Sequence, residues 1–297
     1  MALRPILGLL CAGVAALIWG GGAVVSRHLV THSLDPLDLA LLRYAGCFPI
    51  ALLAVLGLGR RARLDLDWGR LAVLLMLAGP PYQLLLITGY AHATAGGGAL
   101  LVSGLLPVFS FLIPLLSTNA RPSPGVTLGA ALAVAGLVVF NAGPAQAAFS
   151  DAGLFIFSLA AMLWAALNHL VRSWRIDPLR LTVALALWSP LFLPVYLVLR
   201  PSGFATAPPR EIALQLVYHG WLVAFAATLL FFTAVRLAGL VTSSVLQALA
   251  PCLSAALGAL LLAEPLSGQQ QAGIAITTAG VMLTAAGGAV AARWRRS

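Results

Sequence analysis

The sequence predicts an all-α integral membrane protein, with ten transmembrane helices arranged as a 5+5 inverted repeat around a central cavity. Composition is the first reason, because 61% of the 297 residues are hydrophobic and only 8% are charged. Such a composition excludes a soluble domain with a charged surface. The second reason is that the apolar residues form runs of ~20, the length that crosses a bilayer. The third is that one such run, with a proline near its middle, occurs twice.

The apolar runs follow one another with short connections, so the residues that carry the function must lie within the helices. The first five predicted helices are Ile6 to Ser26, Leu37 to Leu58, Leu71 to Tyr90, Ala95 to Ser117 and Gly125 to Asn141. The second five are Ala152 to Arg172, Leu179 to Leu199, Ile212 to Val235, Leu240 to Ala263 and Gln270 to Ala291. We expect residues 1–148 and 149–297 to form the two repeats of one membrane domain.

Several positions of the two halves match. A shift of 144 positions places Pro107 on Pro251, and a shift of 145 places Trp19 on Trp164. Because each half has five helices, an odd number, the second half enters the membrane from the opposite side, which makes the repeat inverted. Glycines that recur every seven residues in the fifth and tenth helices predict close helix packing. They are Gly129, Gly136 and Gly143, matched by Gly273, Gly280 and Gly287.

The arginines predict the orientation of the chain. With the N-terminus in the cytoplasm, the inner segments hold 13 arginines and the outer loops hold three, which are Arg27, Arg200 and Arg210. Cytoplasmic loops carry the excess of positive charge, so we expect both termini in the cytoplasm and the protein in the cell inner membrane. Arg43 lies within the second helix, near its outer end, and snorkelling of its side chain to the interface is a sufficient explanation.

The order of these motifs resembles one known family. Each half has a tryptophan in its first helix; Leu-Leu-Pro occurs in the fourth helix and Leu-Ala-Pro in the ninth, and Ala263-Glu264-Pro265 follows the ninth. The chain is similar to the drug/metabolite transporter superfamily, to its EamA-type permeases and, among these, to bacterial exporters of aromatic amino acids. The resemblance implies export of metabolites. The first half has Ala120-Arg121-Pro122 where the second has the acid, so a role for Glu264 does not extend to both halves.

Three aromatic side chains are predicted near the middle of the membrane. At ~1.5 Å per helical residue, Trp19, Tyr82 and Trp164 lie roughly 16 to 20 Å from an end of their helices. Trp and Tyr usually lie at the two interfaces, and rings that face lipid are the alternative explanation. Three rings at similar depth, two of them at equivalent positions of the repeat, favour a shared aromatic cavity.

Polar side chains near these rings complete the predicted substrate site. Asn168 lies four residues after Trp164, and Gln247 lies four residues before Pro251, so each pair shares a helix face. Hydrogen bonding between helices is the alternative role for such groups. Pro107 and Pro251 each remove a backbone donor and are the predicted hinges. The predicted substrate-binding residues are Trp19, Tyr82, Ser103, Trp164, Asn168, His169, Ser244 and Gln247.

Missing groups narrow the function further. All eight Asp and Glu residues fall at loops or helix ends, which argues against a proton exchanger built on a midplane carboxylate. His169 could contact the substrate or carry a proton, and His219 lies at a shallower depth in the eighth helix. For both we expect a neutral, hydrogen-bonded state, although an ionisable group inside a membrane is a functional candidate. The sequence has no His-Glu-x-x-His and no Gly-x-Ser-x-Gly motif, so we expect no metal site, no catalytic residue and no enzyme.

A largely neutral cavity suits a neutral, zwitterionic or hydrophobic solute. We therefore expect a secondary transporter that exports amino acids, aromatic and hydrophobic ones first, by alternating access. Export of hydrophobic metabolites or drugs is the alternative, and an intramembrane enzyme is a more distant one. The expected partners are a small-molecule substrate and the lipid bilayer, with no cofactor and no nucleic acid, and we expect a monomer to be functional.

Overall fold

The structure is a computed structural model, and it describes residues 3–59, 66–118, 123–142, 148–199 and 206–294. Apart from one isolated bridge between Ala93 and Phe149, the regular structure of these residues is helical. The first half forms α1 (Leu3–His32), α2 (Pro36–Leu58), α3 (Trp68–Ala78), α4 (Pro80–Gly89), α5 (Ala95–Thr118) and α6 (Pro124–Asn141). The second half forms α7 (Asp151–Ser173), α8 (Pro178–Trp188), η2 (Ser189–Phe192), α9 (Leu193–Leu199), α10 (Pro209–Gln215), η4 (Leu216–Ala226), α11 (Ala227–Ala238), α12 (Leu240–Gln247), α13 (Ala250–Leu261) and α14 (Gly268–Trp294).

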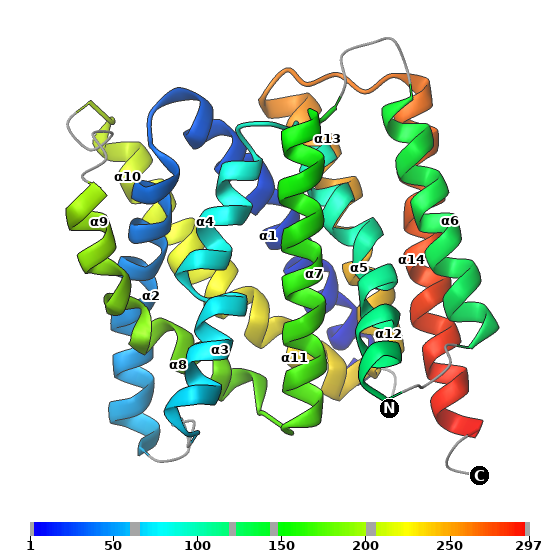
Figure 1. Cartoon of the computed structure of the whole chain (residues 1–297), viewed down its shortest axis with the longest axis horizontal. Helices are drawn as coiled ribbons and strands as arrows, with labels where there is room; N and C mark the ends of the chain where they lie inside the picture. Colours follow the sequence, from blue (N-terminus) through cyan, green and yellow to red (C-terminus); the bar gives the residue numbers. More distant parts are fainter. Residues whose placement is uncertain (1–2, 60–65, 119–122, 143–147, 200–205, 295–297) are drawn as a thin grey trace.

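Most of these helices run side by side across the molecule (Figure 1). Within the described residues, nine helices or helix series are long and apolar enough to cross a membrane. The tenth predicted helix lies within α14, which has 27 residues but is not one of these nine, so the count of ten stays a prediction. The start of α1 and the end of α14 lie toward the same edge (Figure 1), as an even number of crossings requires.

Aspartates begin the second helix of each half. Asp35 accepts a hydrogen bond from the backbone N–H of Leu37 and forms a capping box with Asp38 at the start of α2. Asp177 caps α8 in the same way, accepting from the backbone N–H of Arg180 at 3.0 Å. A side-chain oxygen at this position satisfies one of the free N–H groups of the first turn. The Asp-Pro-Leu sequence therefore has the same structural role in both halves.

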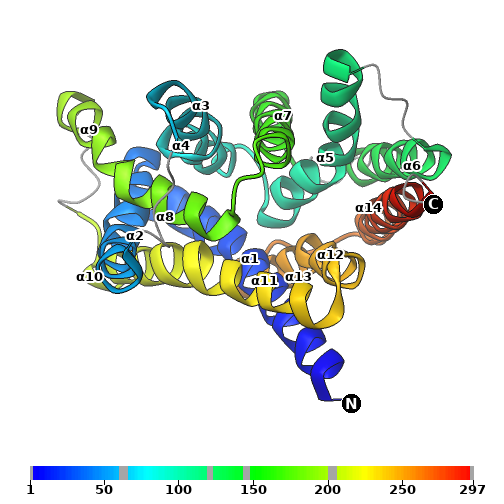
Figure 2. The ribbon, with the colours of Figure 1, turned by 90° about the horizontal axis from the view of Figure 1, so that it is seen from below.

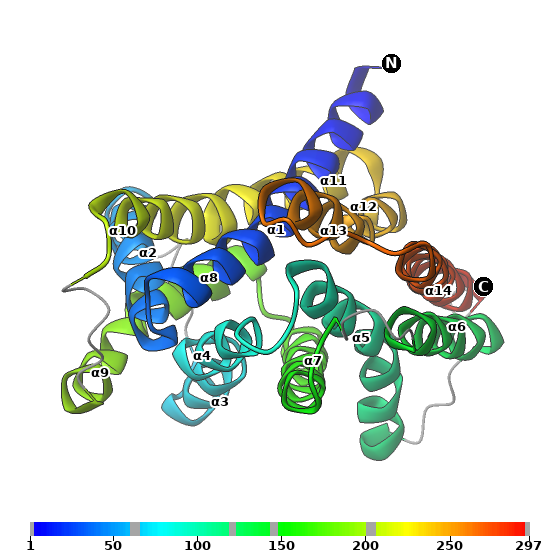
Figure 3. The same ribbon diagram turned by 90° about the horizontal axis from the view of Figure 1, so that it is seen from above.

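The contact between α6 and α14 supports an inverted relation of the halves. A methyl group at Gly136 would meet the backbone nitrogen of Thr277, and one at Gly280 would meet the backbone nitrogen of Ala133. Thr277 and Gly280 lie 144 positions after Ala133 and Gly136, so each helix presents the same surface to the other. Such a self-complementary contact between antiparallel helices is what a two-fold relation produces. The pair lies at one end of the molecule (Figures 2 and 3).

Several spans that were predicted as single helices are interrupted. The third span divides into α3 and α4 at Gly79, which precedes two prolines, and the ninth divides into α12 and α13 before Pro251. The seventh span contains the short 3-10 segment η2, and the eighth contains the π-helical segment η4 of 11 residues. Interrupted membrane helices expose backbone groups that need a partner, and in transporters they lie at the substrate site.

Candidate substrate site

Tyr82 and Trp164 form a stacked pair beside the interruption of the third span. Their ring centroids lie 5.4 Å apart and their planes differ by 27°. Tyr82 is in the first turn of α4 and only 4% exposed, whereas Trp164, on α7, is half-buried. Trp164 also packs against the apolar cluster that contains Leu74 and Ala78 of α3. The structure thus brings together two of the three predicted aromatic residues.

Trp19 belongs to a second aromatic pair. It packs against Phe231 of α11, with ring centroids 5.6 Å apart and planes inclined by 58°. Trp19 matches Trp164 in the repeat, and each of the two rings contacts a span of the other half, Trp19 the eighth and Trp164 the third. Phe231 itself is not the repeat equivalent of Tyr82, because a shift of 144 or 145 places Tyr82 on Ala226 or Ala227. Phe231 was missed by the sequence analysis.

Arg43 of α2 is half-buried, and its guanidinium lies within electrostatic range of Tyr82 of α4 and of His219 of η4. The interpretation that this side chain snorkels to the interface stays a prediction. Both of those residues are buried. None of the ion pairs among the described residues involves Arg43. A cation without a carboxylate partner inside a membrane span is a candidate for binding an anionic group.

The interruption between α3 and α4 adds polar backbone groups beside Arg43. Pro80 and Pro81 have no N–H, so two carbonyls of the preceding turn lose their helical donors. The Tyr44 hydroxyl, next to Arg43 on α2, lies 3.5 Å from the carbonyl oxygen of Ala78. The Tyr44 hydroxyl therefore lies next to the interruption that precedes Tyr82, and Arg43 acts electrostatically on Tyr82.

The predicted polar residues are half-buried on three spans. Within the described residues, none of their side chains makes a hydrogen bond, so they remain available to a solute. Asn168 is on the same face of α7 as Trp164. These residues are Ser103 on α5, Asn168 and His169 on α7, and Ser244 and Gln247 on α12. The neighbouring Ser243 has a structural role, because its hydroxyl donates to the carbonyl of Gly239 at 2.9 Å.

Both predicted hinge prolines are buried, but their settings differ. Pro107 lies inside α5, which continues through it, and Figure 2 shows this helix changing direction along its length. Pro251 lies in the first turn of α13, directly after the interruption of the ninth span. The proline pattern alone therefore does not determine where a helix ends.

Comparison with known proteins identifies the family. The model of the EamA-like transporter family matches residues 6–142 and, a second time, residues 151–286. The chain belongs to the EamA-like transporter family. It is accordingly a multi-pass membrane transporter of the drug/metabolite transporter type.

Solved structures confirm the fold of this EamA transporter. A structure described only as a crystal structure of a protein matches with a TM-score of 0.65 and 20% identity, over 93% of this chain and 94% of its own. At that identity the likeness shows the fold alone. In all, 16 chains of known structure match. The search of curated proteins found no match.

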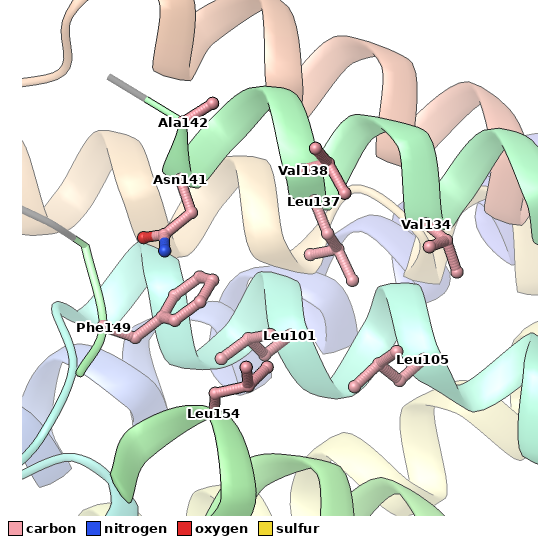
Figure 4. A pocket seen from close by; sticks show the side chains of 9 residues that line it. All are labelled: Leu101, Leu105, Val134, Leu137, Val138, Asn141, Ala142, Phe149 and Leu154. Carbon is pink, nitrogen blue, oxygen red and sulfur yellow. The ribbon is translucent and has the colours of Figure 1, made fainter. Parts of the chain in front are cut away.

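An apolar pocket of about 390 Å³ lies between α5, α6 and α7 of the EamA fold (Figure 4). It contains none of the predicted substrate-binding residues. Asn141 supplies the polar side chain, and its Oδ1 atom is buried without a hydrogen-bond partner among the described residues. The lining residues are Leu101, Leu105, Val134, Leu137, Val138, Asn141, Ala142, Phe149 and Leu154.

An ion pair joins the two halves of the transporter at the edge opposite the termini. Arg27 donates from Nε to Glu264 Oε1 at 3.0 Å and from Nη1 to the carbonyl of Tyr90 at 2.7 Å. Glu264 Oε2 accepts from the backbone N–H of Ala95, at the start of α5, at 2.9 Å. The acid of the Ala-Glu-Pro motif therefore holds α1, α5 and the segment after α13 together. Its counterpart in the first half, residues 120–122, lies outside the described residues.

Two further acids of the EamA transporter are buried, although both lie in the first turn of a helix as the sequence predicts. Asp38 of α2 is fully buried and accepts a hydrogen bond from the Tyr196 hydroxyl at 2.8 Å. Glu211 of α10 is 7% exposed, and its Oε1 lies 3.7 Å from Nε2 of His28. Among the described residues, no group of three or more His, Cys, Asp or Glu side chains could hold a metal ion.

Proposed function

We propose that this EamA transporter exports amino acids, aromatic and hydrophobic ones first, across the cell inner membrane. One observation carries the proposal, namely the stacked rings of Tyr82 and Trp164 beside the unpaired cation of Arg43. An aromatic side chain packs against such rings with ~0.5 to 1.5 kcal/mol per pair beyond its burial. The substrate carboxylate needs a donor that is both charged and accessible, which Arg43 supplies.

The amino group of the substrate needs acceptors rather than a fixed negative charge. We assign this role to the amide oxygens of Asn168 and Gln247, the hydroxyls of Ser103 and Ser244, and the imidazole of His169. Free carbonyls next to Pro80 and Pro81 are further acceptors. Each contact is individually weak, which suits a transporter because the substrate must be released.

Alternating access follows from the two-fold organisation. We assign the two repeats to residues 1–148 and 149–297, and the hinges to Pro107 and Pro251. Rocking of one five-helix repeat against the other would expose the fixed site to each side in turn.

Cytoplasmic termini follow from the arginine asymmetry, and a cysteine at Ser297 in intact cells would test them. Labelling of that cysteine by a probe restricted to the outside would reverse the assigned orientation.

Export of hydrophobic metabolites or drugs is the second candidate function. The apolar pocket between α5, α6 and α7 favours it, because that pocket would hold an uncharged hydrophobic solute. The two candidate functions differ in whether the substrate needs a carboxylate. Arg43 is central to the export of amino acids and has no role in the export of hydrophobic metabolites or drugs.

Transport by reconstituted vesicles distinguishes the candidates. We expect wild-type protein to move phenylalanine and leucine faster than a charged amino acid, and Tyr82→Ala, Trp164→Ala and Gln247→Ala to slow this movement. We expect Arg43→Gln to lose phenylalanine transport but to keep transport of phenylalanine amide, which has no carboxylate. Unchanged transport in all four variants would refute the assigned site. Faster movement of the charged amino acid by wild-type protein would refute the substrate class.

A further inference from the structure

Three polar side chains of the eighth span are buried at intervals of four residues. Glu211 is 7% exposed, Gln215 is fully buried and His219 is 5% exposed. Glu211 and Gln215 belong to α10, and His219 belongs to the π-helical segment η4. Residues four apart lie on one face of a helix. The eight residues from Glu211 to His219 extend about 12 Å into the membrane at 1.5 Å per residue.

Each of these side chains has one buried polar atom without a hydrogen-bond partner among the described residues. The atoms are Oε2 of Glu211, Oε1 of Gln215 and Nδ1 of His219. An unsatisfied polar atom in a low-dielectric interior costs about 1 to 3 kcal/mol, so three of them on one face need a common explanation. Ordered water molecules satisfy such atoms in other buried polar sites.

The other polar atoms of these residues are held by α1 and α2. Gln215 donates from Nε2 to the carbonyl of Leu39 at 2.8 Å, and His219 Nε2 lies 3.1 Å from Ser26 Oγ. The tautomer that donates Nε2–H to Ser26 leaves the Nδ1 lone pair free to accept a proton. At the outer end, the side chain of His28, which faces Glu211, is 37% exposed. The row of unsatisfied atoms thus begins near the surface and ends deep between α1, α2 and η4.

We propose that Glu211, Gln215 and His219 line a hydrated proton pathway, which leads from the outer surface to the centre of the transporter. A proton from outer water would convert the Glu211 carboxylate to a carboxylic acid. It would pass through water held at the Gln215 amide oxygen, since the amide itself does not titrate. It would then bind Nδ1 of His219 and form an imidazolium.

The charged and titratable groups around this pathway come from three elements. His28 of α1 faces Glu211, and Asp38 of α2, whose carboxylate accepts from Tyr196, lies next to the Leu39 carbonyl that binds Gln215. At the inner end, the positive charge of Arg43 of α2 acts on His219 and disfavours an imidazolium there. Because Arg43 is the proposed partner of the substrate carboxylate, a carboxylate bound to Arg43 would offset this repulsion, which would couple proton binding to substrate binding. This inference rests on the proposed function only for that last step.

Proton movement in reconstituted vesicles tests the pathway. We expect a phenylalanine gradient imposed on wild-type protein to drive proton movement, which a pH-sensitive dye inside the vesicles reports. Glu211→Gln and His219→Gln should lose this proton movement and keep phenylalanine exchange at equal pH on both sides. Gln215→Met, which keeps the volume but loses the amide oxygen, should weaken it. Glu264→Gln is the matched control, because it makes the same chemical change at an ion-paired carboxylate away from the pathway.

A chemical measurement keeps this inference separate from the choice of substrate. Carbodiimides modify carboxylic acids that are protonated in apolar surroundings, and mass spectrometry locates the modified residue. We expect modification of Glu211 and none of Glu264. This result supports the pathway even if wild-type protein does not transport phenylalanine. Absence of modification at Glu211, or proton movement that persists in both Glu211→Gln and His219→Gln, would overturn it.

Discussion

The two halves carry a proline at the same place in their fourth and ninth spans, yet only the ninth span is interrupted. The helix α5 continues through Pro107, whereas α12 and α13 separate before Pro251. The neighbouring helix explains the difference. A methyl group at Gly20 of α1 would lie 2.8 Å from the Ala250 carbonyl oxygen, so that interruption packs directly on a glycine. The matching position of α7 is Ala165, which leaves less room for such an approach.

The third and eighth spans differ in a similar way. Gly79 and the two prolines after it divide α3 from α4, and the eighth span instead has the π-helical segment η4 without any proline. Gly220 of η4 packs on Gly46 of α2, and the Cys47 thiol donates to the Gly220 carbonyl at 3.3 Å. Backbone irregularity therefore occurs in both halves near the candidate site, but different residues produce it.

In the contact between α6 and α14, the two halves present the same surface to each other. We expect the largest loss of stability when this contact is disrupted. Gly136→Ala and Gly280→Ala would each place a methyl group against the partner backbone, and such overpacking costs typically ~1 to 3 kcal/mol. We expect the two variants to lower thermal stability in detergent by similar amounts. Gly57→Ala is the control, because no atom lies within 4 Å of the added methyl group. A clear loss in only one of the two variants would contradict the equivalence.

The two tryptophans are equivalent in the repeat, but the ring pairs that they form differ in burial. Tyr82 is 4% exposed and stacked on Trp164, whereas Phe231 is half-buried and tilted against Trp19. A lost ring pair is worth ~0.5 to 1.5 kcal/mol, so we expect Tyr82→Ala to raise the phenylalanine KM about two- to tenfold. Phe231→Ala should have a smaller effect. Phe155→Ala, at a side chain on α7 that is 70% exposed, is the control. A larger effect of Phe231→Ala would move the site to the other pair.

Replacing the two prolines by alanine should affect different properties, stability for Pro107→Ala and the transport rate for Pro251→Ala. Pro107→Ala restores a donor inside a continuous helix, and a restored backbone hydrogen bond contributes roughly 1 kcal/mol. Pro251 lies in the first turn of α13, where a missing N–H is tolerated, so Pro251→Ala should leave stability nearly unchanged. We expect Pro251→Ala instead to slow transport, because the helix can extend across the interruption. Thermal stability and transport rate measured on the same preparations would show whether the two effects separate.

Sequence reasoning located much of the fold because its signals are periodic. Helix length sets the runs of ~20 apolar residues. The repeat sets the constant shift that relates the prolines, the glycines and the two tryptophans of the halves. Depth along a helix also pointed to Tyr82 and Trp164, whose rings stack in the structure. The direction in which a side chain points depends on the partner helix, so the sequence did not reveal that Arg43 is close to Tyr82 and His219.

Burial at helix ends could not be predicted from the sequence. Glu211 and Asp38 lie in first turns, in line with their predicted place at helix ends, and the structure adds that both are buried, Asp38 against Tyr196 and Glu211 near His28. The π-helical segment η4 gave no signal, because nothing in Leu216–Ala226 distinguishes it from an α-helix by composition. The Gly-Pro-Pro sequence at residues 79–81 did carry a signal for the α3–α4 interruption. The single helix predicted there was wrong.

The smallest expected effect concerns the ion pair between Arg27 and Glu264, which joins the halves on one side of the membrane. The two side chains are 25% and 16% exposed, and a partly exposed pair contributes only ~0.2 to 1 kcal/mol. Glu264→Gln keeps an oxygen that can accept from the Ala95 N–H, so the charge interaction is the main loss. A double-mutant cycle of Arg27→Gln and Glu264→Gln, followed by thermal unfolding at low and high salt, should give a coupling energy in that range that decreases with salt. Strictly additive effects of the two substitutions would mean that the pair does not hold the halves together.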